Sequence, residues 1–182
     1  METTVEIRPA TRADETALVG IDRATWNPSS GVGPRPGAGA AFFTERRAPE
    51  DTLVAHDAGA VVGYVTLKQA TELESNRHVL TVNGIAVDPS AQGRGIGATL
   101  IAAAARLARA RGARRLTLRV LGSNPGAQRL YERAGFVVEG RLRGEFLLDG
   151  RYVDDVLMAI ELGSEHADRE LSARRSGAAR YL

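Results

Sequence analysis

Residues 92–100 of this chain read QGRGIGATL, a glycine-dense run in the middle of the sequence. It follows an apolar run, Val79 to Val87, that stops at Asp88-Pro89 as a strand would. It leads into Ile96 to Arg111, where apolar residues recur at helical spacing. A turn between a strand and a helix presents unpaired backbone N–H groups and the positive end of the helix dipole. The run therefore predicts a binding site for a phosphate or pyrophosphate group.

The strand before this turn contains Asn83-Gly84, which allows two interpretations. Asn-Gly is the strongest short signal for a β-hairpin with a type I′ turn. It is also compatible with one strand that is interrupted by a bulge or splay at Gly84. Two separate strands here would be short, and their flanking residues alternate poorly. We therefore expect a single interrupted strand.

The segment after the turn completes a βαβ unit. Gly112 ends the helix as a C′ glycine, and Leu116 to Val120 has the composition of a second strand. A strand–helix–strand crossover is right-handed and joins parallel strands. Asn124-Pro125 then combines an N-cap residue with proline at the first helical position, so another helix is expected from there to near Ala134.

The rest of the chain adds strands and two helices, which predicts a mixed α/β fold with helices on both faces of the sheet. Thr11 is expected to cap a helix over residues 12–25, and a short helix is expected over Ala40 to Arg47. The remaining expected strands are Val5–Arg8, Thr52–His56, Val61–Leu67, Phe136–Glu139, Phe146–Leu148 and Tyr152–Leu162. Residues 27–39 and 71–78 are expected loops, and 163–182 a disordered polar tail outside a domain at 1–162.

Composition excludes several classes of function. Of 182 residues, 43% are hydrophobic and 25% charged, and no apolar run approaches the roughly 20 residues of a membrane span. The absence of cysteine excludes disulfides, thiolate nucleophiles and Cys-ligated metal; with no secretory leader, we expect a cytoplasmic protein without membrane contact. The net charge is only +2 and the arginines are dispersed, which argues against nucleic-acid binding.

Two familiar phosphate motifs fit the glycine-rich run poorly. A P-loop needs Gly-Lys-Ser/Thr, and Lys68, the only lysine, is far away. A dinucleotide fingerprint fits the spacing of Gly93, Gly95 and Ala98, but it needs an acidic residue about 20 positions later, where the chain reads RVLG from Arg119. On these glycines alone, a turn that only joins strand to helix stays open.

Residues further along the chain complete a recognisable set. Gln92, Gly95 and Gly97 fit the pattern Gln/Arg-x-x-Gly-x-Gly/Ala, preceded by the strand IAVDP at 85–89. The pattern Asn-x-x-Ala…Leu-Tyr…Gly-Phe is matched downstream by Asn124, Ala127, Leu130-Tyr131 and Gly135-Phe136, and a closing strand runs from Asp149 through Met158. In this order and spacing the chain resembles the GCN5-related N-acetyltransferase (GNAT) superfamily over about residues 5–162.

The resemblance implies an enzyme that binds acetyl-CoA without metal, on a mixed sheet of about seven strands splayed between its two central parallel strands. Backbone amides of the glycine-rich run would cradle the CoA pyrophosphate, with added charge from Arg94. The pantetheine arm would pair with the preceding strand like a short extra strand. The implied cofactor-binding residues are Ile85, Ala86, Val87, Gln92, Gly93, Arg94, Gly95, Ile96, Gly97, Ala98, Asn124 and Tyr131.

The resemblance also implies catalytic roles. Tyr131 would be the general acid for the leaving thiolate, although a buried core tyrosine is the alternative; Asn124 can cap its helix and touch CoA at once. The family's strand glutamate falls near Thr81, which cannot serve as a base. The remaining base candidates, each with a solvated loop residue as its alternative, are Glu72, Glu74 and His78. A water relay, or a substrate that enters already neutral, is equally open, and Asp154 and Asp155 could hold a cationic substrate.

We therefore expect transfer of an acetyl group to a primary amine by direct attack in a ternary complex. A small-molecule acceptor is favoured, such as an amino acid, a polyamine or an aminated antibiotic, bound between the loops 27–39, 71–78 and the last hairpin. The alternatives are a protein N-terminal or lysine acetyltransferase and a non-catalytic acyl-CoA-binding regulatory module. The resemblance also allows a homodimer.

Overall fold

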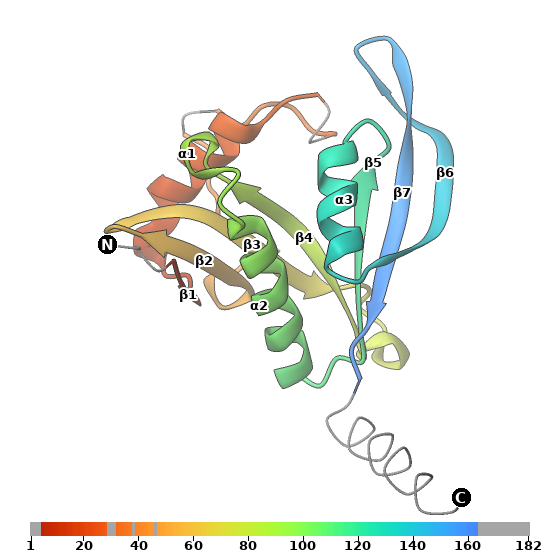
Figure 1. The fold of residues 1–182 in the computed structure, drawn as a ribbon, viewed down its shortest axis with the longest axis horizontal. Coiled ribbons are helices and arrows are strands. Elements are labelled where there is room, and N and C mark those ends of the chain that lie inside the picture. The colour runs from red at the N-terminus through yellow and green to blue at the C-terminus, as the bar shows by residue number, and fades with distance from the viewer. Residues whose placement is uncertain (1–4, 29–31, 38, 46, 164–182) are drawn as a thin grey trace, which may run out of the picture.

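The fold is an open seven-stranded sheet, and the glycine-rich run follows one of its two central strands (Figure 1). The computed structural model describes residues 5–28, 32–37, 39–45 and 47–163. The strand order is β1-β2-β3-β4-β5-β7-β6, and each neighbouring pair is antiparallel except β4–β5. The strands are β1 Glu6–Pro9, β2 Thr52–Asp57, β3 Ala60–Gln69, β4 Val79–Val87, β5 Arg115–Leu121, β6 Val137–Leu148 and β7 Arg151–Glu161.

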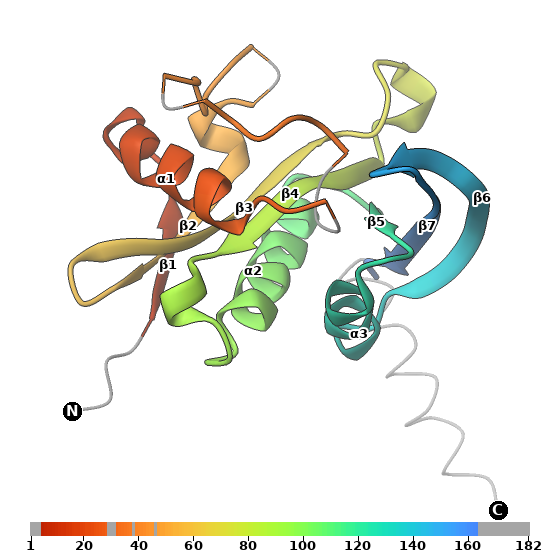
Figure 2. The ribbon, with the colours of Figure 1, turned by 90° about the horizontal axis from the view of Figure 1, so that it is seen from above.

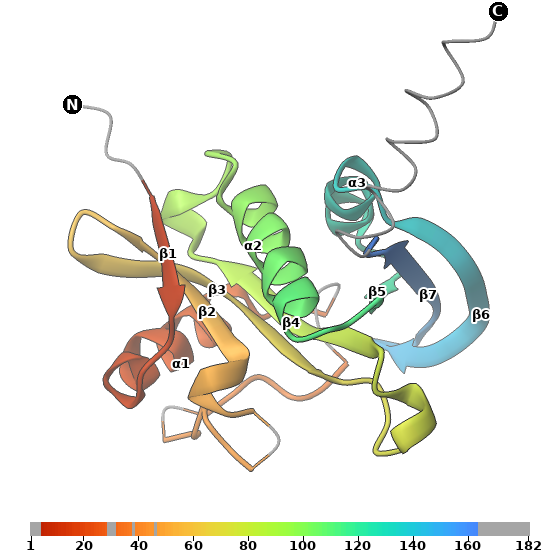
Figure 3. The same ribbon diagram turned by 90° about the horizontal axis from the view of Figure 1, so that it is seen from below.

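Helices cover both faces of this sheet, as the sequence predicts (Figures 2 and 3). Helix α1, Glu15–Thr25, lies on one face, whereas α2, Ile96–Ala110, and α3, Pro125–Arg133, lie on the other. The larger core lies under α2 and α3 and includes the fully buried Leu100 and Leu116. The smaller core lies under α1 and is formed by Ala10, Leu18, Ile21, Phe42, Phe43, Val54 and Tyr64.

The run from Val79 to Val87 is one strand, so the single interrupted strand is confirmed and the hairpin is not formed. Its register against β3 shifts between the pairs Thr66↔Gly84 and Leu67↔Val82, which leaves Asn83 as an extra residue. A bulge of this kind reverses which side chains face each side of the sheet beyond it. The Asn83-Gly84 signal therefore marks a bulge in the middle of the sheet.

The central parallel strands are joined at one end only. β4 and β5 are paired from Val79↔Arg115 to Thr81↔Thr117. Beyond Thr81 the two strands separate, while β4 stays paired to β3 as far as Val87↔Gly63 and β5 to β7 as far as Leu121↔Asp155. The expected splay is therefore present, and the edge of β4 that faces β5 is without a partner strand from Val82 onward.

The expected helix over Ala40 to Arg47 is wrong. Among the described residues of this segment the backbone forms bends and a tight turn, closed by hydrogen bonds between Thr44 and Arg47 in both directions. The amides of Phe42 and Phe43 donate to one carboxylate oxygen of Glu15, at 2.7 and 3.2 Å, so they do not bond to carbonyls one helical turn back. Tertiary contacts of α1 and the buried phenylalanine rings thus override local helical preference.

Two further expectations are settled differently at the C-terminal end. The strand pieces expected at 136–139 and 146–148 are parts of one long bulged strand, β6. Residues 164–182 of the expected tail lie outside the described residues.

Strand β6 is an edge strand that exposes Val137, Val138, Leu142 and Leu147, and the expected homodimer stays a prediction. In the described part of the chain no helix has the length and hydropathy to cross a membrane.

Asp14 stabilises the segment that leads into α1. Its carboxylate accepts bonds from Arg8 at 2.8 and 2.9 Å and from the Thr11 amide at 2.8 Å, and its side chain is only 8% exposed. The Arg8 hydrogen bond is the main cause that lowers the pKa of Asp14 to about 2. A carboxyl group with a lowered pKa in the folded state stabilises the fold above its unfolded pKa.

We expect Asp14→Asn to lower the free energy of unfolding by about 2 kcal/mol at pH 7. The difference from the wild type should shrink as the pH falls from about 4 towards 2, because the native carboxylate is then protonated as well. Urea unfolding across this pH range measures both effects. Asp51→Asn removes a more exposed pair with Arg111 and should cost at most about 1 kcal/mol; a difference that is independent of pH would contradict the role of Asp14.

Candidate functional site

The glycine-rich run forms the turn between β4 and α2. Gly93 and Gly95 have φ of 77° and 78°, values that favour glycine, and Gly95 is the N-cap of α2. The first backbone bond of the helix is donated by Thr99 N to Gly95 O at 3.1 Å. The amides before Thr99 lie at the open, positive end of a helix of 15 residues. This is the geometry of an anion site.

Gln92 and Arg94 shape the turn from its two sides. The Gln92 side-chain amide donates to the carbonyl of Val87 at 2.9 Å, which ties the start of the turn to the end of β4. The Arg94 guanidinium pairs with Asp57 at 2.7 Å, and the Asp57 side chain is only 8% exposed. The charge of Arg94 is therefore engaged by the β2–β3 hairpin, and its side chain anchors the turn.

Ile85, Ala86 and Val87 form the part of β4 that leads to this turn. Ile85 and Val87 pack against the core under α2, and Ala86 packs against the core under α1. Their strand is hydrogen-bonded to β3 on one side only, since β5 has already separated. The free backbone edge thus runs from the splay directly to the N-terminus of α2.

Helix α3 closes the other side of the splay (Figure 1). Asn124 caps it by accepting the Ala127 amide at 3.1 Å, as predicted. A Cβ at Gly97 would lie 3.3 Å from Leu130, so this glycine lets the first turn of α2 approach α3 closely. Ile96 is buried in the core and Ala98 lies in the same first turn. The glycine-rich run and α3 therefore border one space.

Tyr131 lies on the core side of α3 with its ring centroid 6.0 Å from that of Phe136. Burial raises the pKa of Tyr131 to about 12. Among the described residues none hydrogen-bonds to its hydroxyl group, which leaves this proton free for another partner. The Tyr131 hydroxyl group is thus protonated at neutral pH and can donate a hydrogen bond or a proton.

A cavity of about 380 Å³ lies on the opposite side of the sheet, between α1 and the segment after it. Its polar lining includes Asp22 of α1, Arg47 and the bulge residue Asn83. Asp22 accepts hydrogen bonds from Arg47, at 3.1 Å, and from the Tyr64 hydroxyl group. The apolar lining is Val19, Pro36, Ala40, Ala41 and Phe42.

Asp22, Arg47, Tyr64 and Asn83 were not predicted as site residues. The loop 27–39 was expected at the acceptor pocket, and Pro36 does line this cavity. One signal was available in the sequence: Asp22 follows Leu18 by one helical turn, so it lies on the buried stripe of α1, where an unexplained charge is unusual.

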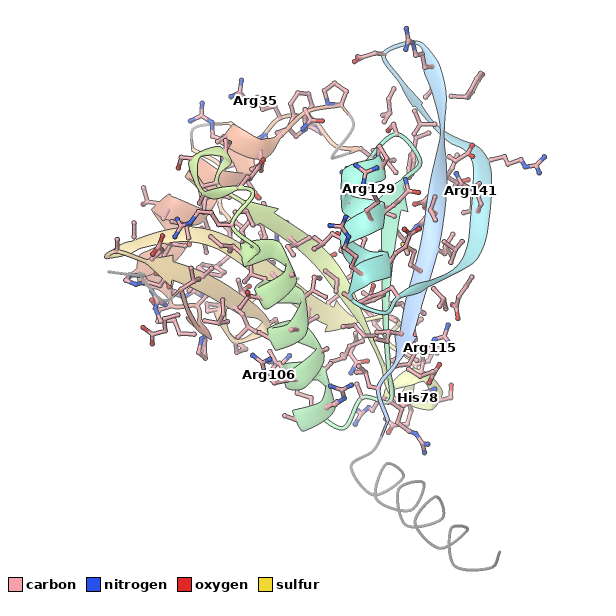
Figure 4. All side chains as sticks on the ribbon, viewed as in Figure 1. Arg35, His78, Arg106, Arg115, Arg129 and Arg141 are labelled. Atoms are coloured by element: carbon pink, nitrogen blue, oxygen red, sulfur yellow. The ribbon has the colours of Figure 1, made fainter. Side chains whose placement is uncertain are left out.

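The predicted base candidates lie at the far end of β4. His78 is exposed, and its carbonyl accepts the amides of Arg114 and Arg115 where β4 and β5 are paired. Figure 4 shows His78 and Arg115 together at this closed end. Six residues of extended strand place His78 about 20 Å from Gly84.

The two glutamates before His78 differ from each other. Glu74 is exposed and forms an ion pair with Arg77 at 2.7 Å, outside the splay. Glu72 lines a second cavity, of about 730 Å³, that also reaches Asn83. Glu72 therefore shares a cavity with the bulge residue Asn83.

Asp154 and Asp155 of β7 are already occupied. Asp155 is buried and pairs with Arg119. Asp154 accepts the Gly144 amide at 2.9 Å, which is the main cause of its lowered pKa, and it also contacts Arg141 at 3.3 Å. Both carboxylates therefore already pair with arginines of the neighbouring strands β5 and β6. In the described ranges no three acidic or histidine side chains gather as metal ligands would.

Comparison with known proteins fits this geometry. The model of the acetyltransferase (GNAT) family matches residues 19–136. The chain belongs to this family. The matched region begins on α1, includes β4, the glycine-rich turn and α2, and ends at Phe136 just after α3.

Several GNAT relatives are similar to the chain. It is 33% identical to a mycothiol acetyltransferase of Gordonia bronchialis over 155 residues, covering 79% of this chain and 42% of the relative. It is 40% identical to a spermidine N(1)-acetyltransferase of Vibrio cholerae over 86 residues, 47% of this chain and 49% of the relative. The chain thus spans between 25% and 49% of the length of the curated relatives it matches.

A solved structure shares the whole fold. The yncA protein of Salmonella typhimurium, solved with its cofactor acetyl-CoA, superposes with a TM-score of 0.75 at 21% identity, over 88% of this chain and 95% of that one. This likeness shows that the described residues share the overall fold of that structure.

Proposed function

We propose that the protein is an N-acetyltransferase that moves the acetyl group of acetyl-CoA to the primary amine of a small molecule. The observation that carries this proposal is the splay of β4 from β5, which opens directly onto the unpaired amides at the N-terminus of α2. A strand edge and a helix N-terminus in line suit a ligand with an amide-bearing arm and a pyrophosphate.

The donor would lie along this line. Amides from Gly93 to Ala98 would bind the pyrophosphate, and the free edge of β4 at Ile85 to Val87 would pair with the pantetheine amides. Asn124 and Tyr131 would border the sulfur end from α3. The relative solved with acetyl-CoA shares this fold, which supports the placement of the donor.

The transfer itself is a direct attack. The ammonium group of the acceptor first loses one proton to water. The neutral nitrogen then bonds to the thioester carbonyl carbon, the carbon–sulfur bond breaks, and a second proton leaves the nitrogen to water or a base. An amide of β4 near the bulge would bind the oxygen that becomes negative. Tyr131 would give its proton to the leaving thiolate, since its raised pKa keeps it protonated at neutral pH.

The acceptor would occupy the cavity between α1 and β4. Its volume of about 380 Å³ is in the range of small-molecule sites, and Asn83 brings it to the central strand. One relative is named for spermidine, a small polyamine, which supports this assignment. A protein N-terminus or lysine, or acyl-CoA binding without catalysis, are the alternatives.

The proposal is tested by release of free CoA from acetyl-CoA in the presence of spermidine, propylamine, L-methionine, D-glucosamine and a peptide with a free N-terminus. We expect turnover with at least one small amine above the rate of hydrolysis. Activity on the peptide alone would favour the protein acetyltransferase. Binding of acetyl-CoA with no turnover on any amine would identify a non-catalytic binding module.

The glycine-rich turn gives a matched pair of variants. Gly95→Ala and Gly112→Ala both place a side chain at φ near +80°, at the start and the end of α2, with open space around each. Each should cost about 1 kcal/mol of stability. Only Gly95→Ala should weaken acetyl-CoA binding, by about tenfold, because it redirects amides of the anion site. Isothermal titration and urea unfolding separate the two; equal affinities would place the pyrophosphate elsewhere.

Tyr131→Phe should lower kcat by about 10²-fold, a typical contribution of general acid catalysis, and leave the affinity for acetyl-CoA nearly unchanged. The hydroxyl group makes no bond to the described residues, so its removal should not destabilise the core. The measurement is a pre-steady-state rate of acetyl transfer, which reports on chemistry even if product release limits kcat. An unchanged chemical step would leave Tyr131 with a packing role only.

A further inference from the structure

We propose that Asp22 of α1 binds the positively charged amine of the acceptor and places its nitrogen beside β4. This inference rests on the proposed function and adds an acceptor-binding residue to it.

Asp22 is the carboxylate that lines the cavity between α1 and β4. Its side chain is 20% exposed, and the cavity is the open side it faces together with Arg47 and Asn83. One oxygen of Asp22 accepts the Tyr64 hydroxyl and the other accepts Arg47 at 3.1 Å. A carboxylate has about four acceptor positions, so each oxygen can accept one more N–H donor.

A chain of short contacts links Asp22 to the centre of the splay. The Tyr64 hydroxyl that donates to Asp22 lies 3.7 Å from the Cβ position of Gly84. Gly84 is the residue after the bulge, on the part of β4 that has lost its β5 partner. Tyr64 therefore connects the carboxylate, through one hydrogen bond and one van der Waals contact, to the strand against which the thioester would lie.

Burial keeps this arrangement rigid. Tyr64 is 4% exposed and stacks edge-on against Phe42, with ring centroids 4.8 Å apart. The pKa of Tyr64 is strongly raised, first by burial and then by the charge of Asp22 and the hydrogen bond to it, so its hydroxyl stays a donor. The Arg47 guanidinium lies 4.4 Å above the Phe42 ring. Asp22 is thus held from two sides and cannot turn away from the cavity.

An ammonium group finds hydrogen-bond acceptors in this cavity. Arg47 and Asp22 carry one opposite charge each, so the attraction is local to the Asp22 oxygens, on the side away from the guanidinium. An alkylammonium could donate to the free positions of Asp22 and to the Asn83 side-chain oxygen, both of which line the same space. Carboxylates as a class are far weaker bases than alkylamines, so we assign binding and orientation of the ammonium group to Asp22. The ammonium group loses its proton to water before the nitrogen attacks.

The test compares acceptors of the same shape but different charge. Propylamine is a cation at neutral pH, whereas O-ethylhydroxylamine, in which oxygen replaces the carbon next to the nitrogen, is uncharged. Wild type, Asp22→Asn and the control Glu161→Gln are assayed with both acceptors and with the best amine of the panel. Glu161→Gln also removes one carboxylate of an arginine pair, but at the paired end of β5 and β7.

We expect Asp22→Asn to lower kcat/KM for the charged amines by about 10- to 100-fold, mainly through KM, as loss of a charged hydrogen bond does. The rate with O-ethylhydroxylamine and the affinity for acetyl-CoA should stay near wild type, and Glu161→Gln should change neither. An equal loss for charged and neutral acceptors, or no loss, overturns the inference while the proposed function stands. No turnover by the wild type overturns both.

A second variant guards against loss of folding. In Asp22→Asn the Arg47 charge is left without its partner, which can destabilise the segment around Phe42. Asp22→Asn combined with Arg47→Gln removes both charges and leaves none unpaired. It should show the same selective loss for the charged amine; retained kcat/KM for propylamine in this folded double variant contradicts a role for Asp22.

Discussion

The separation of β4 from β5 after Thr81 is the constraint on which the rest of this structure depends. A parallel pair of strands would normally close its backbone edges along its whole length, and here the pairing covers only Val79↔Arg115 to Thr81↔Thr117. The unpaired edge of β4 is costly unless something else satisfies it. β3 and β7 keep the two halves of the sheet intact on either side, so the opening is confined to the centre. That confinement leaves one unpaired strand edge at the centre of the sheet, where we propose that the donor binds.

Different groups lie on the two faces of the sheet at this opening. On one side α2 begins at Gly95 and presents its amides, with α3 close enough to touch Gly97 through Leu130. On the other side α1 and the segment held by Glu15 enclose an acceptor-sized cavity. The bulge at Asn83 reverses the side-chain alternation between these regions. Strand β4 thus lies between the donor side and the acceptor side and contacts both.

Local sequence patterns predicted the anion-binding turn and the order of the central elements. The turn, the βαβ unit and the Asn124 cap each depend on residues close together in the sequence, so their spacing was sufficient to predict them. The segment 40–47 failed for the opposite reason, because its amides bind a carboxylate 27 residues away, at Glu15. Arg94 was expected to add charge at the pyrophosphate because of the resemblance to the GNAT superfamily, and its partner Asp57 lies 37 residues away on a hairpin. Long-range partners of this kind leave no trace in local composition.

The residues around Asp22 show how far a long-range contact can be predicted from the sequence. Tyr64 and Asp22 are 42 residues apart, and nothing in either sequence neighbourhood names the other. Asp22 nevertheless belongs to the stripe that contains Leu18, Ile21 and Thr25, and burial of an ionised carboxylate on such a stripe requires a compensating donor. The sequence therefore indicates that Asp22 needs a hydrogen-bond donor, and only the fold shows that Tyr64 and Arg47 are the donors. A charge on the buried stripe of a helix beside a splayed sheet therefore points to the acceptor site that we propose, whereas the loop residues Glu74 and His78 lie at the closed end of β4.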